Sequence, residues 1–194
     1  MIDETMRFLA DALNAHLDRH LGRQTEAYAV ASALSSPDGA LAQGIEQRVV
    51  LAIVNIERET GAGMLAPRAA RTQEGSYAQM PAPISLNLSV LMASHHPRYT
   101  EALKRLSASI GFVQVHPVFE GSAWPTFPQR LERITTEVVN LDLHALSNLW
   151  NALGVKYMPS VLLRVRMLTI DEGRAERRIP EVQGLERSLN PRPL

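Results

Sequence analysis

The sequence predicts one domain of the α/β (α+β) class, built on a mixed or antiparallel sheet of about four to five strands flanked by helices. Residues 83–171 show the order strand, helix, strand, helix, strand, with breaks at proline, glycine and aspartate. A β-branched run occupies 49–56, and a helical apolar stripe occupies 2–21. The chain of 194 residues suits one core, which we expect over residues 1–171, followed by a C-terminal arm over 172–194.

The N-terminal half begins with an expected helix that ends at Gly22. Its apolar side chains have helical spacing: Ile2, Met6, Leu9, Leu13 and Leu17. Residues 27–34 are ambiguous between strand and helix, whereas the run 49–56 is typical of a central strand covered on both faces. Residues 61–80 show neither period and predict a long loop that orders against a partner.

The C-terminal half has clearer boundaries. Residues 84–90 alternate apolar and small polar side chains, which predicts a strand with one buried face and one face turned to water or a partner. An amphipathic helix is expected over 99–110, a short strand within 112–119, and a longer strand over 131–141.

The last helix and strand carry the most specific local signals. Asp142 is a typical cap residue, and Gly154 follows the apolar stripe of the helix that begins there. The final strand is expected over 161–170. Its alternation separates an apolar face from a basic one: Leu163, Val165 and Met167 lie on the first, Arg164 and Arg166 on the second.

Composition argues against several classes of protein. Lys and Arg number 20, as do Asp and Glu, so we expect no nucleic-acid partner, because such binders carry a basic surplus. The absence of cysteine excludes disulfides, thiolate nucleophiles and cysteine-ligated metals. The first residues do not form a secretory signal and no apolar run is long enough to span a membrane, so we expect no membrane partner and a cytoplasmic location.

Catalytic motifs are absent from the sequence. It contains no nucleophile elbow, no phosphate-binding loop and no dinucleotide-binding spacing. Glu57 and Glu59 share one side of a strand and could serve acid–base chemistry, but an exposed strand end explains them more simply. We therefore expect no enzyme activity and no bound cofactor.

Histidines supply the main alternative, a small metal-dependent enzyme or ligand-binding domain. His16 and His20 lie four residues apart on the expected first helix, where both rings could reach one metal ion or simply flank the apolar stripe. His95, His96 and His116 are a second candidate set, although histidines beside a proline are commonly polar loop residues. We expect no metal at either set.

Several side chains are candidates for contacts with partners. Trp124 and Phe127 are either interface anchors or cover for the rim of the core. Arg164 and Arg166 either bind a carboxylate-rich partner or face solvent. The remaining candidates come from the long loop and the arm: Tyr77, Arg177 and Arg178.

Several segments together resemble one family. They are the N-terminal helix, the strand ending Asn55-Ile56-Glu57-Arg58-Glu59, the segment Pro83-Ile84-Ser85-Leu86-Asn87-Leu88, the helix Leu146-Ser147-Asn148-Leu149-Trp150-Asn151-Ala152-Leu153-Gly154, and Met158-Pro159-Ser160-Val161. Over residues 1–171 the chain resembles the N-terminal domain of the cap, or tail-terminator, proteins of phage-tail-like contractile injection systems of the antifeeding-prophage type.

The resemblance implies a tail-terminator fold and a structural role. Such subunits form a homo-hexamer ring that closes the distal end of the inner tube and binds the last sheath ring, which stops polymerisation and couples sheath to tube. The implied partners are further copies of this chain, the inner tube protein and the sheath protein, within a phage-tail-like particle that can be released from the cell. An adaptor that binds one partner without forming a ring is a further alternative.

Overall fold

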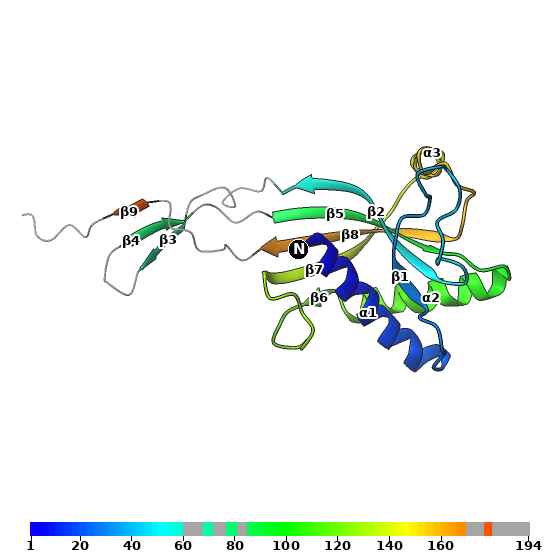
Figure 1. The fold of residues 1–194 in the computed structure, drawn as a ribbon, viewed down its shortest axis with the longest axis horizontal. Coiled ribbons are helices and arrows are strands. Elements are labelled where there is room, and N and C mark those ends of the chain that lie inside the picture. Colours follow the sequence, from blue (N-terminus) through cyan, green and yellow to red (C-terminus); the bar gives the residue numbers. More distant parts are fainter. Residues whose placement is uncertain (60–67, 72–76, 81–84, 170–176, 180–194) are drawn as a thin grey trace, which may run out of the picture. The chain divides into compact units, whose positions relative to one another are not determined.

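A curved sheet of six strands organises the larger part of the described chain, with helices on both of its faces (Figure 1). The computed structural model describes residues 1–59, 68–71, 77–80, 85–169 and 177–179. The sheet and its helices form one unit of the chain, and a smaller sheet forms a second unit.

The strand order of the large sheet is β1-β2-β5-β8-β7-β6, with β1 parallel to β2 and every other neighbour antiparallel. In that order the strands are Ala29–Ala31, Val49–Arg58, Ser85–Ser94, Ser160–Thr169, Leu131–Val139 and Val118–Phe119. The α+β class with a mixed sheet is confirmed. The sheet has six strands and not about four to five, because β1, in the segment left ambiguous by the sequence, has only three residues and is too short to show a period of two.

Strand β2 corrects the prediction of a central strand for residues 49–56. It lies second from the edge of the sheet, next to β1. Only its first half, Val49 to Ala52, is buried, and residues 55–58 are exposed. The continuous apolar run therefore marks the covered half of the strand and says nothing about its place in the sheet.

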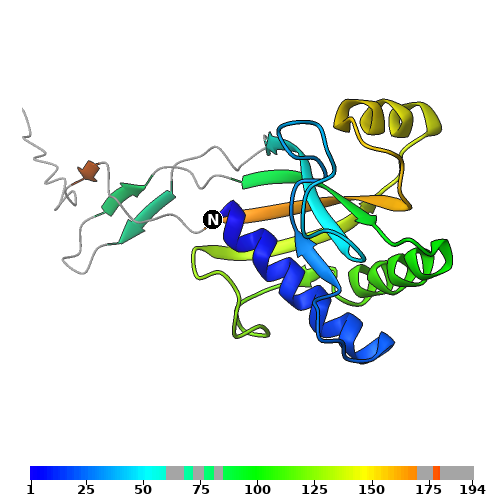
Figure 2. The same ribbon diagram turned by 45° about the vertical axis from the view of Figure 1, so that its right-hand side comes forward.

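Two helices, α1 (Ile2–Leu21) and α2 (Tyr99–Val115), pack on one face of the sheet and enclose the main core. Leu13 and Leu17 of α1 are 1% and 0% exposed, as their spacing predicts. Helix α3 (Leu143–Leu153) packs on the opposite face and covers only one end of it (Figures 1 and 2). Its Trp150 packs there in a smaller core.

The predicted caps of α3 are confirmed. Asp142 accepts a hydrogen bond at Oδ1 from the Ala145 N–H at 2.7 Å, which satisfies a free donor of the first turn. Gly154 ends the helix with φ 68°, in the left-handed region that favours glycine. These local signals place α3 without reference to the rest of the fold.

Helix α2 is longer than expected, and the short strand predicted within residues 112–119 is confirmed only at Val118–Phe119. The helix continues to Val115, with Phe112 and Val113 buried on its inner face. Aromatic and β-branched residues favour strands on average, but here the burial of one helical face decides the outcome.

Asn14 of α1 occupies the outer edge of β1. Its Nδ2 donates to the Ala29 carbonyl at 2.9 Å, and its Oδ1 accepts from the Ala29 N–H at 2.7 Å. The neighbouring Tyr28 carbonyl and Ser32 N–H bond instead to β2, so Ala29 is the residue that faces away from the sheet. The amide of Asn14 thus takes the place of a neighbouring strand at Ala29.

The smaller sheet consists of β3 (Arg68–Arg71), β4 (Tyr77–Met80) and β9 (Arg177–Ile179), in the order β3-β4-β9 with antiparallel neighbours. The prediction of a loop over 61–80 is wrong at β3 and β4, where the chain forms strands. They are short and contain no β-branched residue, so the sequence carries no strand signal for them. Residues 180–194 of the expected arm lie outside the described residues.

Candidate interaction surfaces

One face of the large sheet changes character along its strands. Under α3 it carries apolar side chains such as Leu91 and Leu162, which pair across β5 and β8. Two residues further along, Ser89 pairs with Arg164, and next Asn87 pairs with Arg166. Alternate residues of a strand share a face, so the apolar floor beneath α3 continues directly into polar residues.

We call this continuation the open polar face. It consists of Asn55 and Glu57 of β2, Asn87 and Ser89 of β5, Arg164 and Arg166 of β8, and Thr135 and Glu137 of β7. These side chains are exposed or half-buried, and no described helix covers them. The structure therefore places the two predicted arginines side by side on the polar face of the sheet.

Ion pairs and hydrogen bonds link the open polar face across its strands. Arg164 binds Glu137 with an Nη1 to Oε1 distance of 2.7 Å. Arg166 lies 3.1 Å from Glu59, measured from Nε to Oε2, and Asn87 donates to the same carboxylate oxygen at 2.8 Å. Both arginine side chains are 48% exposed, whereas Glu137 is 59% exposed and Glu59 only 20%. The exposed Arg164–Glu137 pair contributes about 0–1 kcal/mol, so a partner's carboxylate can replace Glu137 at little cost.

Trp124 and Phe127 lie against the main core. Both rings meet Phe8 of α1 edge-to-face, with centroid distances of 5.7 and 5.4 Å. Phe127 is 7% exposed, and Trp124 is partly buried beside it. Aromatic rings prefer edge-to-face contacts of this kind, so Trp124 and Phe127 hold the segment after β6 against α1.

The histidines fall into separate groups. His16 and His20 stack with ring centroids 4.0 Å apart, and His116 meets His16 edge-to-face at 6.2 Å. Burial lowers the pKa of His16 and of His116, and in His16 the nearby His20 and Arg19 lower it further. Within the described residues, no three His, Asp or Glu side chains are arranged to hold a metal ion.

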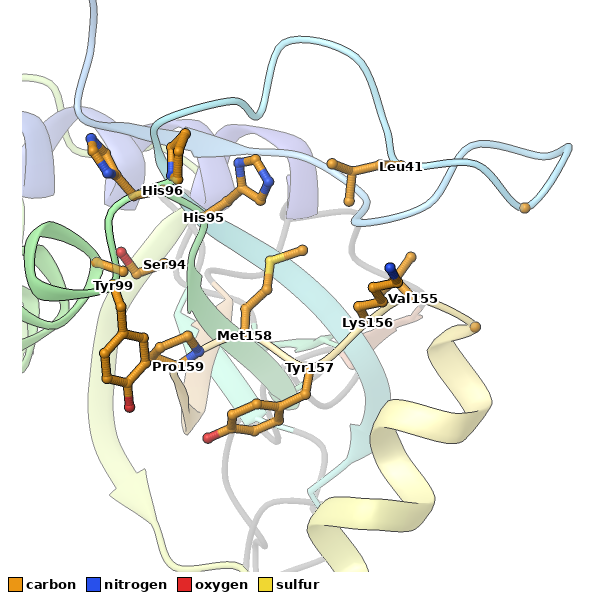
Figure 3. Close-up of a pocket in the computed structure, with 14 residues that line it drawn as sticks. Leu41, Ser94, His95, His96, Tyr99, Val155, Lys156, Tyr157, Met158 and Pro159 are labelled. Carbon is orange, nitrogen blue, oxygen red and sulfur yellow. The ribbon is translucent and has the colours of Figure 1, made fainter.

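His95 and His96 line a cavity of about 560 Å³ that lies where α2 begins and α3 ends (Figure 3). Figure 3 shows Met158 near its centre, with Tyr99 and Tyr157 at its rim. The other lining residues are Gly39, Leu41, Ser94, Pro97, Ala102, Gly154, Val155, Lys156 and Pro159. Because the lining comes from separate segments of the chain, no local sequence pattern displays it.

Tyr77, Arg177 and Arg178 lie in the smaller sheet. Tyr77 pairs with Ile179 between β4 and β9, and Arg178 and Arg177 pair with the next two residues of β4. These residues come from two distant segments of the chain, and the pairing of β4 with β9 brings the segments together. Their roles in contacts remain predictions.

The fold and its exposed features define a class: a mixed α+β domain with one polar sheet face and no recognised catalytic motif. The family described as Pvc16 N-terminal domain matches residues 4–184, and the chain belongs to this family. A comparison with curated protein sequences gives no match.

Two solved structures share the fold. One is a sheath/tube terminator of an extracellular contractile injection system, PVC, in the extended state, with a TM-score of 0.60 and 12% identity; the match covers 94% of this chain and 64% of that one. The other is the anti-feeding prophage cap, a tube-terminating cap, with a TM-score of 0.55 and 16% identity, covering 90% and 58%. The chain thus spans less than two thirds of either neighbour. The resemblance noted in the sequence is confirmed.

A search for membrane-crossing helices among the described residues finds none that is both long and apolar enough.

Proposed function

We propose that this chain is the cap subunit that terminates the inner tube of a contractile injection system. In this proposal a homo-hexamer ring of the chain closes the distal end of the tube, binds the last sheath ring and stops further polymerisation. The particle assembles in the cytoplasm and acts after release from the cell. The chain does this by binding other proteins and without catalysis.

The observation that carries the proposal is the family match over residues 4–184 together with the shared fold. Both solved neighbours are terminators or caps of such particles. The match to the first neighbour covers 94% of this chain, so it includes most of the large sheet and its three helices and extends beyond them.

The open polar face supports the proposal as a docking surface. It carries two half-exposed arginines, whose present partners are the exposed Glu137 and the partly buried Glu59. Electrostatic complementarity chiefly sets the specificity and rate of such contacts. We assign this face to the tube or the sheath protein, with Arg164 and Arg166 binding their carboxylates.

Closing a ring requires two different patches on each subunit, because a head-to-tail ring is heterologous. The smaller unit, formed from residues 60–83 and 171–194, is our candidate for one contact with a neighbouring copy or the sheath. Its described strands include Tyr77, Arg177 and Arg178. Added strands at a sheet edge are a common way for such segments to bind.

The direct test is electron microscopy of the chain co-expressed with the tube and sheath proteins of its particle. We expect a ring of sixfold symmetry at one end of tubes of uniform length, and tubes of uncontrolled length when the chain is omitted. Normal tubes without the chain, together with no density at the tube ends in its presence, would contradict the proposal.

A charge-reversal variant tests the open polar face within the same assay. Arg164→Glu combined with Arg166→Glu should leave the fold intact, because both side chains are half-exposed, and should lower cap occupancy at least tenfold. The matched control is Arg7→Glu combined with Lys104→Glu, which makes the same change of charge on exposed positions of α1 and α2. Equal loss in both variants would show a general charge effect and no role for this face.

Deletion of residues 172–194 tests the smaller unit separately. The truncation removes β9 and should release the sheath from the cap while α1–α3 and the large sheet remain folded. Circular dichroism of the truncated chain provides the folding control. Intact sheath attachment after the deletion would exclude the arm from this contact.

A further inference from the structure

The cavity between the start of α2 and the end of α3 has an apolar, aromatic rim open to solvent. Tyr99 is 64% exposed, Tyr157 61% and Leu41 37%, and all three line the cavity. Its volume of about 560 Å³ falls within the range of about 300–1,000 Å³ for ligand pockets. Exposed tyrosines around a hollow are typical of surfaces that bind other proteins.

The cavity also contains hydrogen-bonding groups without a partner. Ser94, at the end of β5, is 1% exposed, and its Oγ has no hydrogen-bond partner; the same holds for Nδ1 of His95 beside it. Buried polar groups are normally satisfied, and leaving one unpaired costs about 1–3 kcal/mol. These two atoms mark a wall that gains stability when polar groups of a ligand enter.

The same wall carries the N-terminus of α2. Arg98 is its N-cap residue and supplies no side-chain hydrogen bond, so no side chain caps the first turn that begins at Tyr99. The N-terminal end of a helix carries a partial positive charge and favours anions. The uncapped turn and the unpartnered serine therefore lie at one cavity. The turn favours a ligand with acceptor oxygens, and the serine hydroxyl can donate to such an oxygen.

The charges around the cavity agree with this preference. The described lining residues include Lys156 and two histidines and contain no Asp or Glu. Two carboxylates adjoin lining residues in the sequence. Asp38, beside Gly39, accepts hydrogen bonds from Ser36 and Ala40 within its own turn, which lower its pKa. Glu101, beside Ala102, lies in the first turn of α2 and offsets part of its positive charge, but does not line the cavity. Lys156 follows the C-terminal end of α3 and offsets its partial negative charge.

We propose that this cavity binds an acidic segment of a neighbouring protein subunit in the particle. Carboxylates of the segment lie toward the start of α2 and toward Lys156, and an apolar side chain between them fills the space over Met158. The identity of the neighbour as a particle subunit rests on the proposed function; the preference for an acidic, apolar segment does not.

The first experiment needs only the isolated full-length chain and a synthetic probe. The probe is the capped peptide Asp-Leu-Asp-Phe-Asp-Leu, compared at millimolar concentration with the same peptide carrying Lys in place of Asp. The readout is the pair of tryptophan indole N–H signals in NMR spectra, because the chain has two tryptophans and only Trp150 contacts the cavity wall, with its ring 5.4 Å from that of Tyr157.

We expect the acidic peptide to shift the Trp150 signal and to leave that of Trp124 unchanged. Lys156→Glu should weaken this binding about tenfold, whereas Lys104→Glu should not, because Lys104 is exposed on α2 and does not line the cavity. The chain contains only these two lysines, which makes the control an equal change of charge. No shift of Trp150, or equal shifts with both peptides, would overturn the proposal.

The second experiment separates this proposal from the proposed function. The same two lysine variants are scored for cap density at tube ends, and we expect Lys156→Glu to lower occupancy about tenfold relative to Lys104→Glu. Normal capping by both variants would overturn the role of the cavity and leave the cap function standing. Failure of the wild-type chain to cap tubes would overturn the cap function, and the peptide experiment would still decide the cavity's preference.

Discussion

Strands β5, β7 and β8 are core at one end and surface at the other, on the same face of one sheet. On β8, Leu162 lies beneath α3, while Arg164 and Arg166 lie beyond it. On β7, Val139 pairs with Leu162 and Glu137 pairs with Arg164. On each strand the change from apolar to polar side chains falls between the same two cross-strand positions. Helix α3 and the segment that carries Leu34, Ala42 and Ile45 together set how far the second core extends, and the rest of the face lies outside it.

The largest loss of stability is expected from a substitution that removes the side chain by which α3 packs on the sheet. Trp150 is 5% exposed and lies at the centre of the smaller core, so Trp150→Ala should lower the free energy of unfolding by about 3–5 kcal/mol. Urea unfolding followed by circular dichroism measures this loss. Trp150→Phe should cost far less, because it keeps an aromatic ring and removes an unpartnered indole N–H. Equal losses in the two variants would contradict this account.

The next effect compares two positions on one strand. Val50 of β2 is fully buried at the covered end, and Ile56 is 49% exposed at the open end, where it lies on the opposite face of the sheet from Val50. Val50→Ala should cost about 2–3 kcal/mol, whereas Ile56→Ala should cost about 0.5 kcal/mol or less, although it removes more carbon. Thermal unfolding of both variants tests the difference. Comparable losses would mean that the open end is covered in solution.

A smaller effect is expected from the histidine cluster on the other face. The folded chain holds the pKa of His16 and His116 below 6.5, so the unfolded chain takes up protons first as the pH falls. The free energy of unfolding should therefore decrease as the pH drops below about 6.5, and be unaffected by these groups above it. His16→Phe should flatten this dependence, and the exposed His144→Phe should not.

The smallest effect concerns the ion pairs of the open polar face. A double-mutant cycle of Arg164→Ala and Glu137→Ala should give a coupling energy of about 0.2–1 kcal/mol, reduced by salt, because both side chains are exposed. Unfolding at low and at high salt measures it. A coupling of several kcal/mol would show a structural pair and weaken the case for a docking surface.

The sequence predicts those elements whose signals are local. Asp142 and Gly154 fix the ends of α3, and Leu163, Val165 and Met167 identify the buried face of β8. The strands that escaped prediction have no such signal, because β1, β3, β4 and β9 contain three or four residues each. The partners of β1 and β9 also come from other segments of the chain, which one sequence does not reveal.

Of the two candidate surfaces, one could be predicted from the sequence and the other could not. Arg164 and Arg166 could be predicted to share a face because they alternate on one strand with a clear period. The cavity could not, because Leu41, Ser94, Tyr99 and Lys156 meet only once the sheet, α2 and α3 are assembled. Unpaired atoms such as Ser94 Oγ are a property of packing and have no signature in the sequence.

The contact of Asn14 with Ala29 has a consequence for the free chain in solution. An edge strand with free main-chain groups invites another chain to pair with it, which leads to aggregation when protein accumulates. Asn14 satisfies both groups of Ala29 from within the same molecule, so a foreign strand must displace two short hydrogen bonds before it can extend the sheet there. A single amide thus protects the edge of β1 at Ala29 against pairing with another chain.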